Sequence, residues 1–243
     1  MTETGGLSIE VVVAAPVPEV WAALREPQLI RRWHGWEDDS LDAEIEQIYG
    51  AAATVAEPGT RLVLAGGDTV DLATVPGGTR LQLHRAPLGA NPEWDAYYDD
   101  ITEGWTSFVQ QLRFALERHR GSDRRTLHVA STPATAGGIV ERLGVAELRD
   151  RAAGTPYTAT TTLDEDWTGQ VWFVSDRQIG FTVDGYGDGL LILGEEPMAP
   201  HRPDGGSMLL LTAYTGPGDF AAIRERWNRW WVNEFGTTQG ENG

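Results

Sequence analysis

The feature that most constrains the fold is a short strand that leads, through one loop, into a long amphipathic helix. Residues 79–85 alternate apolar and polar side chains after the turn at Pro76-Gly77-Gly78, which predicts a strand. The segment from about Ile101 to Arg120 repeats apolar residues at helical spacing: Phe108, Leu112, Ala115 and Leu116. An antiparallel sheet that ends in this way can bend around the helix and leave an apolar hollow between them. We therefore expect a function that uses an interior cavity.

The same order of elements occurs twice along the chain. In each half a strand is followed by proline, short helices, a run of short strands and a long helix that carries tryptophan. The later strands are expected near residues 43–49, 51–56, 60–65, 69–75 and 79–85 in the first half, and near 156–164, 168–175, 178–184, 188–194 and 207–214 in the second. The second long helix is expected over 217–235, with the apolar stripe Phe220, Ile223, Trp227, Trp230, Trp231 and Phe235. Because Gly121-Ser122-Asp123 breaks the pattern, we expect two domains, 1–121 and 125–243.

Several motifs stand in order between residues 7 and 120. They are Val11-Val12-Val13-Ala14-Ala15-Pro16, Val20-Trp21-Ala22-Ala23-Leu24, Leu29-Ile30-Arg31-Arg32-Trp33, Gly77-Gly78-Thr79-Arg80-Leu81 and Gly104-Trp105. By these motifs the first half resembles the SRPBCC (START-like) superfamily, and within it the family named for activator of heat-shock-protein ATPase homologues. The second half is similar to a degenerate copy, which keeps the order of elements but lacks the Gly-Gly-Thr-Arg and Gly-Trp signatures. The resemblance implies an α+β fold of tandem helix-grip domains, each a curved antiparallel sheet wrapped around its long C-terminal helix. It also implies, commonly, binding of small apolar ligands, and it implies no reaction.

Composition limits the partners. The chain has 36 acidic and 19 basic residues and a net charge of -17, which disfavours nucleic acid and anionic membrane surfaces. There is no cysteine, no secretory signal at the N-terminus and no apolar stretch long enough to span a bilayer, so we expect a cytoplasmic protein without membrane insertion. The five histidines show no metal-binding spacing, and we expect neither a metal site nor a cofactor.

Strand alternation limits the candidates for chemistry. In residues 79–85, Leu81 and Leu83 share the face that looks at the helix, so His84 is expected to face solvent. No catalytic residue is therefore assigned. Ile45 and Gln47 share one face of the expected strand 43–49, which makes both candidates for the cavity wall.

The remaining cavity candidates are aromatic or lie beside aromatic residues. Trp33, His34 and Trp36 end the second short helix, where the resemblance implies the cavity mouth. There, His34 either contacts a ligand or is exposed beside tryptophans that only pack. Trp94, Tyr97 and Tyr98 lie on the connection before the long helix and form either a lid or a hydrophobic staple. The helix itself contributes Trp105, Phe108 and Leu112.

Three functions follow from these observations. The leading hypothesis is non-catalytic binding of a small apolar molecule. The alternative is an enzyme of the polyketide aromatase/cyclase type, which would need a convergent pair among His34, Gln47 and Tyr49. The third is a protein-interaction module, because the strands around 171–174, 190–193 and 208–211 are apolar on both faces. That pattern predicts a homodimer or tight interdomain packing through the second sheet.

Overall fold

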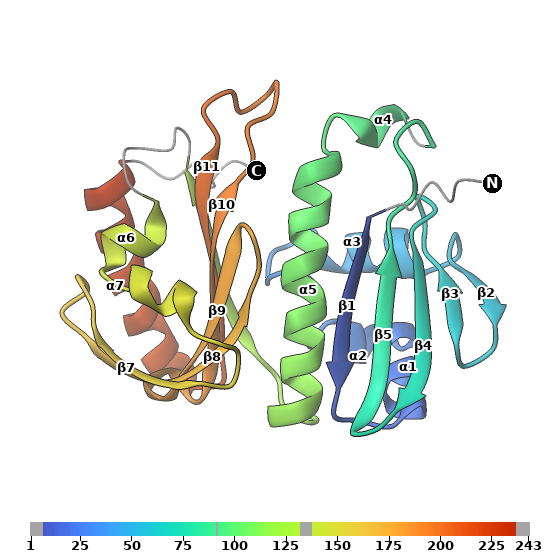
Figure 1. Ribbon diagram of the computed structural model, residues 1–243, viewed down its shortest axis with the longest axis horizontal. Helices are drawn as coiled ribbons and strands as arrows, with labels where there is room; N and C mark the ends of the chain where they lie inside the picture. The colour runs from blue at the N-terminus through green and yellow to red at the C-terminus, as the bar shows by residue number, and fades with distance from the viewer. Residues whose placement is uncertain (1–6, 91, 132–137, 237–243) are drawn as a thin grey trace. The chain divides into compact units, whose positions relative to one another are not determined.

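The chain forms two compact units, Met1–Ser122 and Asp123–Gly243 (Figure 1). The computed structural model describes residues 7–90, 92–131 and 138–236. Across these ranges, no helix combines the length and the apolar character that crossing a bilayer requires.

The first unit contains one antiparallel sheet of five strands in the order β1-β5-β4-β3-β2. The strands are β1 (Ser8–Val13), β2 (Thr54–Glu57), β3 (Arg61–Val63), β4 (Thr69–Val75) and β5 (Gly78–His84). Strands β4 and β5 form a hairpin in which Val75 pairs with Gly78 at the turn and Thr69 pairs with His84 at the far end. Gly78 has a φ of 151°, and a Cβ there would lie 2.0 Å from the Val13 carbonyl oxygen, so only glycine fits this turn.

In the described part of this unit, five helices accompany the sheet: α1 (Val17–Arg25), α2 (Pro27–Ile30), α3 (Leu41–Tyr49), α4 (Pro92–Asp95) and α5 (Tyr98–Arg118). Trp105, Val109 and Leu112 of α5 belong to one apolar core that also contains Leu81 and Leu83 of β5. The side chains from α1 and α2 in the same core are Val20, Ala23, Leu24 and Ile30. The predicted orientation of β5 is confirmed, because Leu81 and Leu83 are buried whereas the His84 side chain is 40% exposed. A sheet that holds a long C-terminal helix in this way is a helix-grip fold.

The segment predicted as a strand over 43–49 is instead helix α3. Leu41, Ile45 and Tyr49 recur at every fourth position, and all three are buried in the core. Asp42 and Glu44 lie in the first turn, where carboxylates favour a helix start. Packing of these three residues in the core therefore favours the helix over the strand that the alternation of Ile45 and Gln47 predicted.

The second unit repeats the arrangement with a six-stranded antiparallel sheet in the order β6-β11-β10-β9-β8-β7. Its strands are β6 (Arg125–Ser131), β7 (Pro156–Thr160), β8 (Asp166–Val174), β9 (Gln178–Val183), β10 (Gly189–Glu196) and β11 (Gly206–Ala213). Its helical segments are α6 (Ile139–Leu143), the short 3-10 segments η1 (Ala146–Asp150) and η2 (Asp184–Tyr186), and α7 (Pro217–Phe235).

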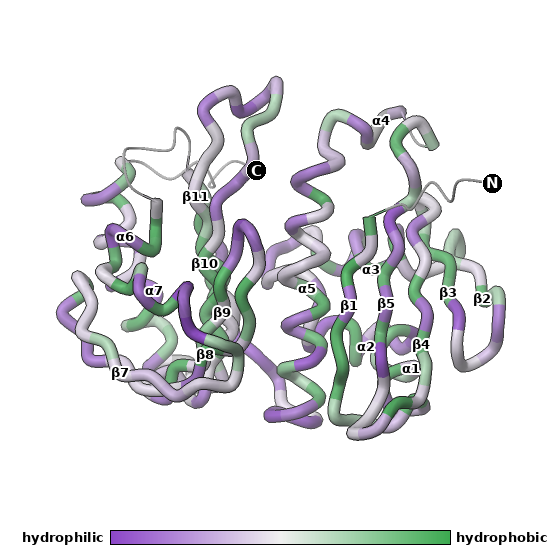
Figure 2. Tube along the Cα trace, viewed as in Figure 1, coloured by the Kyte–Doolittle hydropathy of each residue, from purple (hydrophilic) through white to green (hydrophobic). Residues whose placement is uncertain are grey.

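The predicted stripe of α7 is confirmed. Phe220, Ile223, Trp227, Trp230 and Trp231 are buried in one core with the sheet, and Phe235 packs against that core. Figure 2 shows hydrophilic and hydrophobic residues alternating along α5, whereas β10 of the second sheet has a longer hydrophobic stretch. The predicted fold class, two helix-grip units in tandem, is therefore present in the chain.

Candidate functional site

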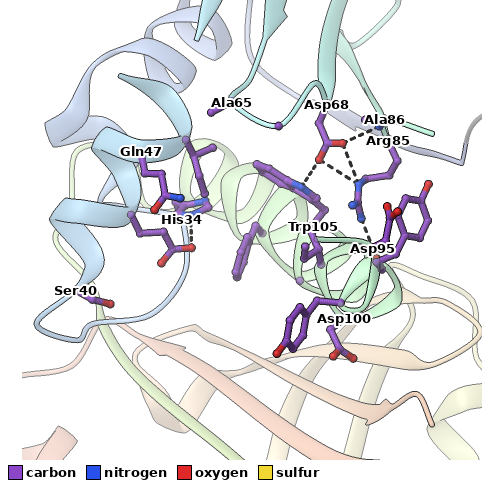
Figure 3. Close-up of a pocket in the computed structure, with 18 of the residues that line it drawn as sticks. His34, Ser40, Gln47, Ala65, Asp68, Arg85, Ala86, Asp95, Asp100 and Trp105 are labelled. Carbon is purple, nitrogen blue, oxygen red and sulfur yellow. Dashed lines mark hydrogen bonds and ion pairs between the residues drawn. The ribbon is translucent and has the colours of Figure 1, made fainter. Parts of the chain in front are cut away.

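The first unit contains a cavity of about 900 Å³ between α3 and the start of α5. Its walls come from four places: the loop between α2 and α3, helix α3 itself, the turn between β3 and β4 together with the segment just after β5, and residues 95–108. Most of the wall is apolar, and a few polar side chains project from it (Figure 3). Concave, largely apolar sites with few polar groups are typical of small-molecule binding.

One end of the cavity carries a buried ion pair. The Arg85 Nε atom donates to Asp68 at 3.1 Å, and their side chains are only 5% and 11% exposed. Asp68 also accepts hydrogen bonds from the Ala86 backbone N–H at 2.8 Å and from Trp105 Nε1 at 2.9 Å, as Figure 3 shows. Three donors therefore balance this carboxylate, which makes its burial tolerable.

The hairpin register brings these two charged residues together. Thr69 is paired with His84, so Asp68 and Arg85 stand one step further along the two strands. Trp105 reaches the same place from α5. These residues are distant along the chain. They meet because the two chain segments stay side by side just beyond the last pair of the ladder.

Arg85 also holds the start of α5. Its Nη1 atom donates to Thr102 Oγ1 at 2.6 Å and to the Tyr98 carbonyl oxygen at 3.2 Å. The guanidinium carbon lies 4.5 Å from the centre of the Tyr98 ring, a cation–π contact. These three contacts fix the Arg85 side chain against the first turn of α5.

A second polar cluster is a chain of three side chains, of which His34 and Glu44 line the cavity. Tyr49 Oη lies 3.0 Å from His34 Nδ1, and His34 Nε2 lies 3.1 Å from Glu44 Oε1. Complete burial raises the pKa of the Tyr49 phenol well above 10.0, and the negative charges of Glu44 and Asp68 raise it further. The phenol is therefore protonated and donates to Nδ1, so the Nε2 N–H donates to Glu44.

His34 is held in a fully buried position. It contacts the Phe108 ring at a centroid distance of 4.7 Å and the Trp105 ring at 5.8 Å. The next residue, Gly35, has a φ of 56° and its carbonyl oxygen accepts a hydrogen bond from Gln111 Nε2 at 3.1 Å. This bond ties the loop to α5. The alternative in which His34 is exposed beside packing tryptophans is wrong.

The cavity wall brings together seven of the predicted residues: His34, Trp36, Gln47, Tyr97, Tyr98, Trp105 and Phe108. Three other candidates lie in the core and do not line the cavity: Trp33, Ile45 and Leu112. Trp33 donates from Nε1 to the Ala23 carbonyl oxygen at 2.9 Å, which explains its burial. The side chain of Trp94 lies outside the described residues.

Gln47 reaches the cavity for a reason other than the predicted one. On a helix, Gln47 lies close to Ala43, Glu44 and Ile48, and all four line the cavity. Ile45 belongs to the opposite, core-facing side of α3. The two residues that the strand prediction placed together are therefore separated by the helix.

Sequence reasoning missed Asp68, Arg85 and Glu44. All three line the cavity. For Asp68 and Arg85 a signal exists: each lies at the end of its strand that is far from the turn at Pro76-Gly77-Gly78, and the observed register extends to this pair. When a helix covers two such positions, residues of opposite charge there can form a buried ion pair.

The imidazole of His34 serves in hydrogen bonding within the protein. Both His34 nitrogens already have partners, so His34 cannot exchange a proton with a ligand without breaking one of these bonds. Among the described residues, no group of three or more His, Asp or Glu side chains is arranged to hold a metal ion.

No family model matches the chain, and no curated protein matches it. Among solved structures, it is similar to DynU16 from the dynemicin biosynthetic locus, at 16% identity over 94% of this chain and 95% of that one, with a TM-score of 0.32. It is also similar to an AHSA1-like protein from Aeromonas hydrophila (19% identity, 46% of this chain and 96% of that one, TM-score 0.32). A third is the di-domain ARO/CYC BexL from the BE-7585A biosynthetic pathway (13% identity, 89% and 87%, TM-score 0.29). These identities and TM-scores are too low to support an inference about function, and the fold stands on the arrangement of the chain itself.

Proposed function

We propose that the first unit binds a small, largely apolar molecule in its cavity and releases it chemically unchanged. The observation that carries this proposal is the size and lining of the cavity, about 900 Å³ with mainly apolar walls. Trp36, Trp105 and Phe108 offer large aromatic surfaces, whose burial against a ligand supplies most of the binding free energy.

The test is to purify the protein from its native host, denature it and analyse the extract for lipophilic compounds by mass spectrometry. We expect a compound that is present in stoichiometric amount with the wild-type protein. The variant Ala43→Phe places a ring on the cavity wall of α3 and should reduce the recovered amount at least about tenfold. Glu46→Phe is the matched control, because Glu46 is exposed on the same helix and does not line the cavity.

An aromatase/cyclase-type enzyme is the second candidate, since His34 and Gln47, two members of the expected pair, both line the cavity. Against it stands the engagement of both His34 nitrogens. Incubating the recovered compound with fresh protein separates the two functions. Unchanged retention time and mass support binding, whereas time-dependent conversion that Glu44→Gln slows supports the enzyme.

A further inference from the structure

We propose that the cavity recognises an uncharged ligand through an oxygen acceptor, such as a ketone, that takes a hydrogen bond from Arg85 Nη2. This inference depends on the proposed binding function and names the chemical class of the ligand.

One donor group of Arg85, Nη2, is left to donate to a ligand in the cavity. Nε donates to Asp68, and Nη1 donates to Thr102 and to the Tyr98 carbonyl. No described residue accepts a hydrogen bond from Nη2. Nη2 is not among the side-chain atoms that are buried without a partner. Since Arg85 lines the cavity, we assign Nη2 as the donor that a ligand meets there.

The charge of Arg85 is already balanced. Asp68 contacts the guanidinium directly, and the pair as a whole is neutral. A ligand carboxylate at Nη2 would bring a second negative charge close to Asp68 and would lose its own hydration. A ketone oxygen accepts the same hydrogen bond without that penalty.

The surroundings of the cavity also oppose anions. Residues 37–46 contain six Asp or Glu and residues 93–103 contain five, and neither segment contains a Lys or Arg. Glu44, Asp95 and Asp100 of these segments line the cavity itself. The resulting negative potential lowers the local concentration of anionic ligands.

An ammonium group does not fit the Arg85 end. It has no lone pair to accept a hydrogen bond and would face the positive guanidinium. The combination of an unused donor, a balanced ion pair and an acidic approach therefore selects a neutral acceptor.

The test compares three probes of nearly equal shape: acetylnaphthalene, isopropenylnaphthalene and naphthoate, substituted at the same ring position. Their end groups are a ketone, a hydrocarbon and a carboxylate. Binding to the full chain is measured by titration calorimetry. We expect the ketone to bind about tenfold more tightly than the hydrocarbon, the gain of one hydrogen bond from a charged donor, and the carboxylate to bind more weakly than both.

A pair of variants locates the effect. Arg85→Met combined with Asp68→Asn removes both charges together, so no unpaired charge stays buried. It should abolish the preference for the ketone over the hydrocarbon, so that the two probes bind equally. Arg80→Met is the matched control, because Arg80 is exposed on β5, the strand that leads to Arg85, and should leave the preference intact.

Each result of the probe series supports or overturns the inference. Equal binding of the ketone and the hydrocarbon, or tightest binding of the carboxylate, overturns the inference and leaves the proposed binding function in place. Failure of all three probes to bind the wild-type protein overturns the proposed function and this inference with it. Because the probe series uses the wild-type chain, misfolding of the double variant does not affect this outcome.

Discussion

Replacing Trp105 with alanine should destabilise the first unit by about 3 kcal/mol. The indole is 5% exposed and packs against His34, Tyr49 and Phe108 at ring-centroid distances of 5.8–6.3 Å. Truncation of a buried tryptophan costs about 3–5 kcal/mol. We expect the lower end, because the residue borders an existing cavity into which its neighbours can relax.

Trp105→Phe separates the packing contribution from the hydrogen bond. It keeps a ring in the core but removes the Nε1 donor to Asp68. Asp68 retains its bonds from Arg85 and the Ala86 N–H, so the expected cost is about 1–2 kcal/mol.

Hydrogen exchange read by mass spectrometry on peptides of β4, β5 and α5 measures this change, because it reports the opening free energy of each segment. A loss of 3 kcal/mol corresponds to exchange faster by roughly a hundredfold. Tyr97→Ala is the control, since that side chain is 49% exposed and its removal should cost within about 0.5 kcal/mol. A change of less than about 0.5 kcal/mol for Trp105→Ala would refute the docking of α5 against the sheet.

Three further predictions concern the same unit. Tyr49→Phe removes the donor to His34 Nδ1 and should cost about 1–3 kcal/mol in urea unfolding at neutral pH. The pKa of Tyr49 in the folded protein is raised above 10.0, so the stability that its phenol contributes is complete below pH 10.0 and falls at higher pH. Above pH 10.0, wild type should therefore lose stability more steeply than Tyr49→Phe. Parallel pH profiles of the two proteins would contradict this. Ile45→Ala should cost about 2–5 kcal/mol whereas Gln47→Ala should cost within about 0.5 kcal/mol and change only ligand affinity, and equal costs would argue against helix α3. Gly78→Ala should cost about 1–3 kcal/mol in thermal unfolding and more than Gly77→Ala, whose added Cβ would meet nothing within 4 Å; the reverse order would contradict the close approach to Val13.

Several elements could be predicted from the sequence because local spacing alone determines them. Alternation in residues 79–85 orients Leu81 and Leu83, since side-chain direction along a strand depends only on position. The stripe of α7 follows in the same way from helical spacing and needs no knowledge of the rest of the chain.

The segment 41–49 could not be predicted because two patterns fit it. Ile45, Gln47 and Tyr49 alternate as in a strand, while Leu41, Ile45 and Tyr49 recur as on a helix. The packing of Tyr49 on Trp33, at a ring distance of 5.9 Å, belongs to the tertiary structure and selects the helix. The local sequence spacing does not predict this contact.

The polar groups of the cavity were missed for a related reason. Asp68 and Arg85 are each unremarkable in their own segments, a turn residue and a strand-end residue. Their role depends on the hairpin register and on Trp105 arriving from α5. Such pairings can be identified only once the fold is known.

The position of Arg85 has a consequence for how the first unit can change. One guanidinium both anchors the opening turn of α5 and borders the cavity. Any substitution that retunes ligand selectivity there also loosens the helix, and any that tightens the helix alters selectivity. Adaptation to a new ligand is therefore easier at the opposite wall, where Gln47 and Ala43 carry no comparable structural duty.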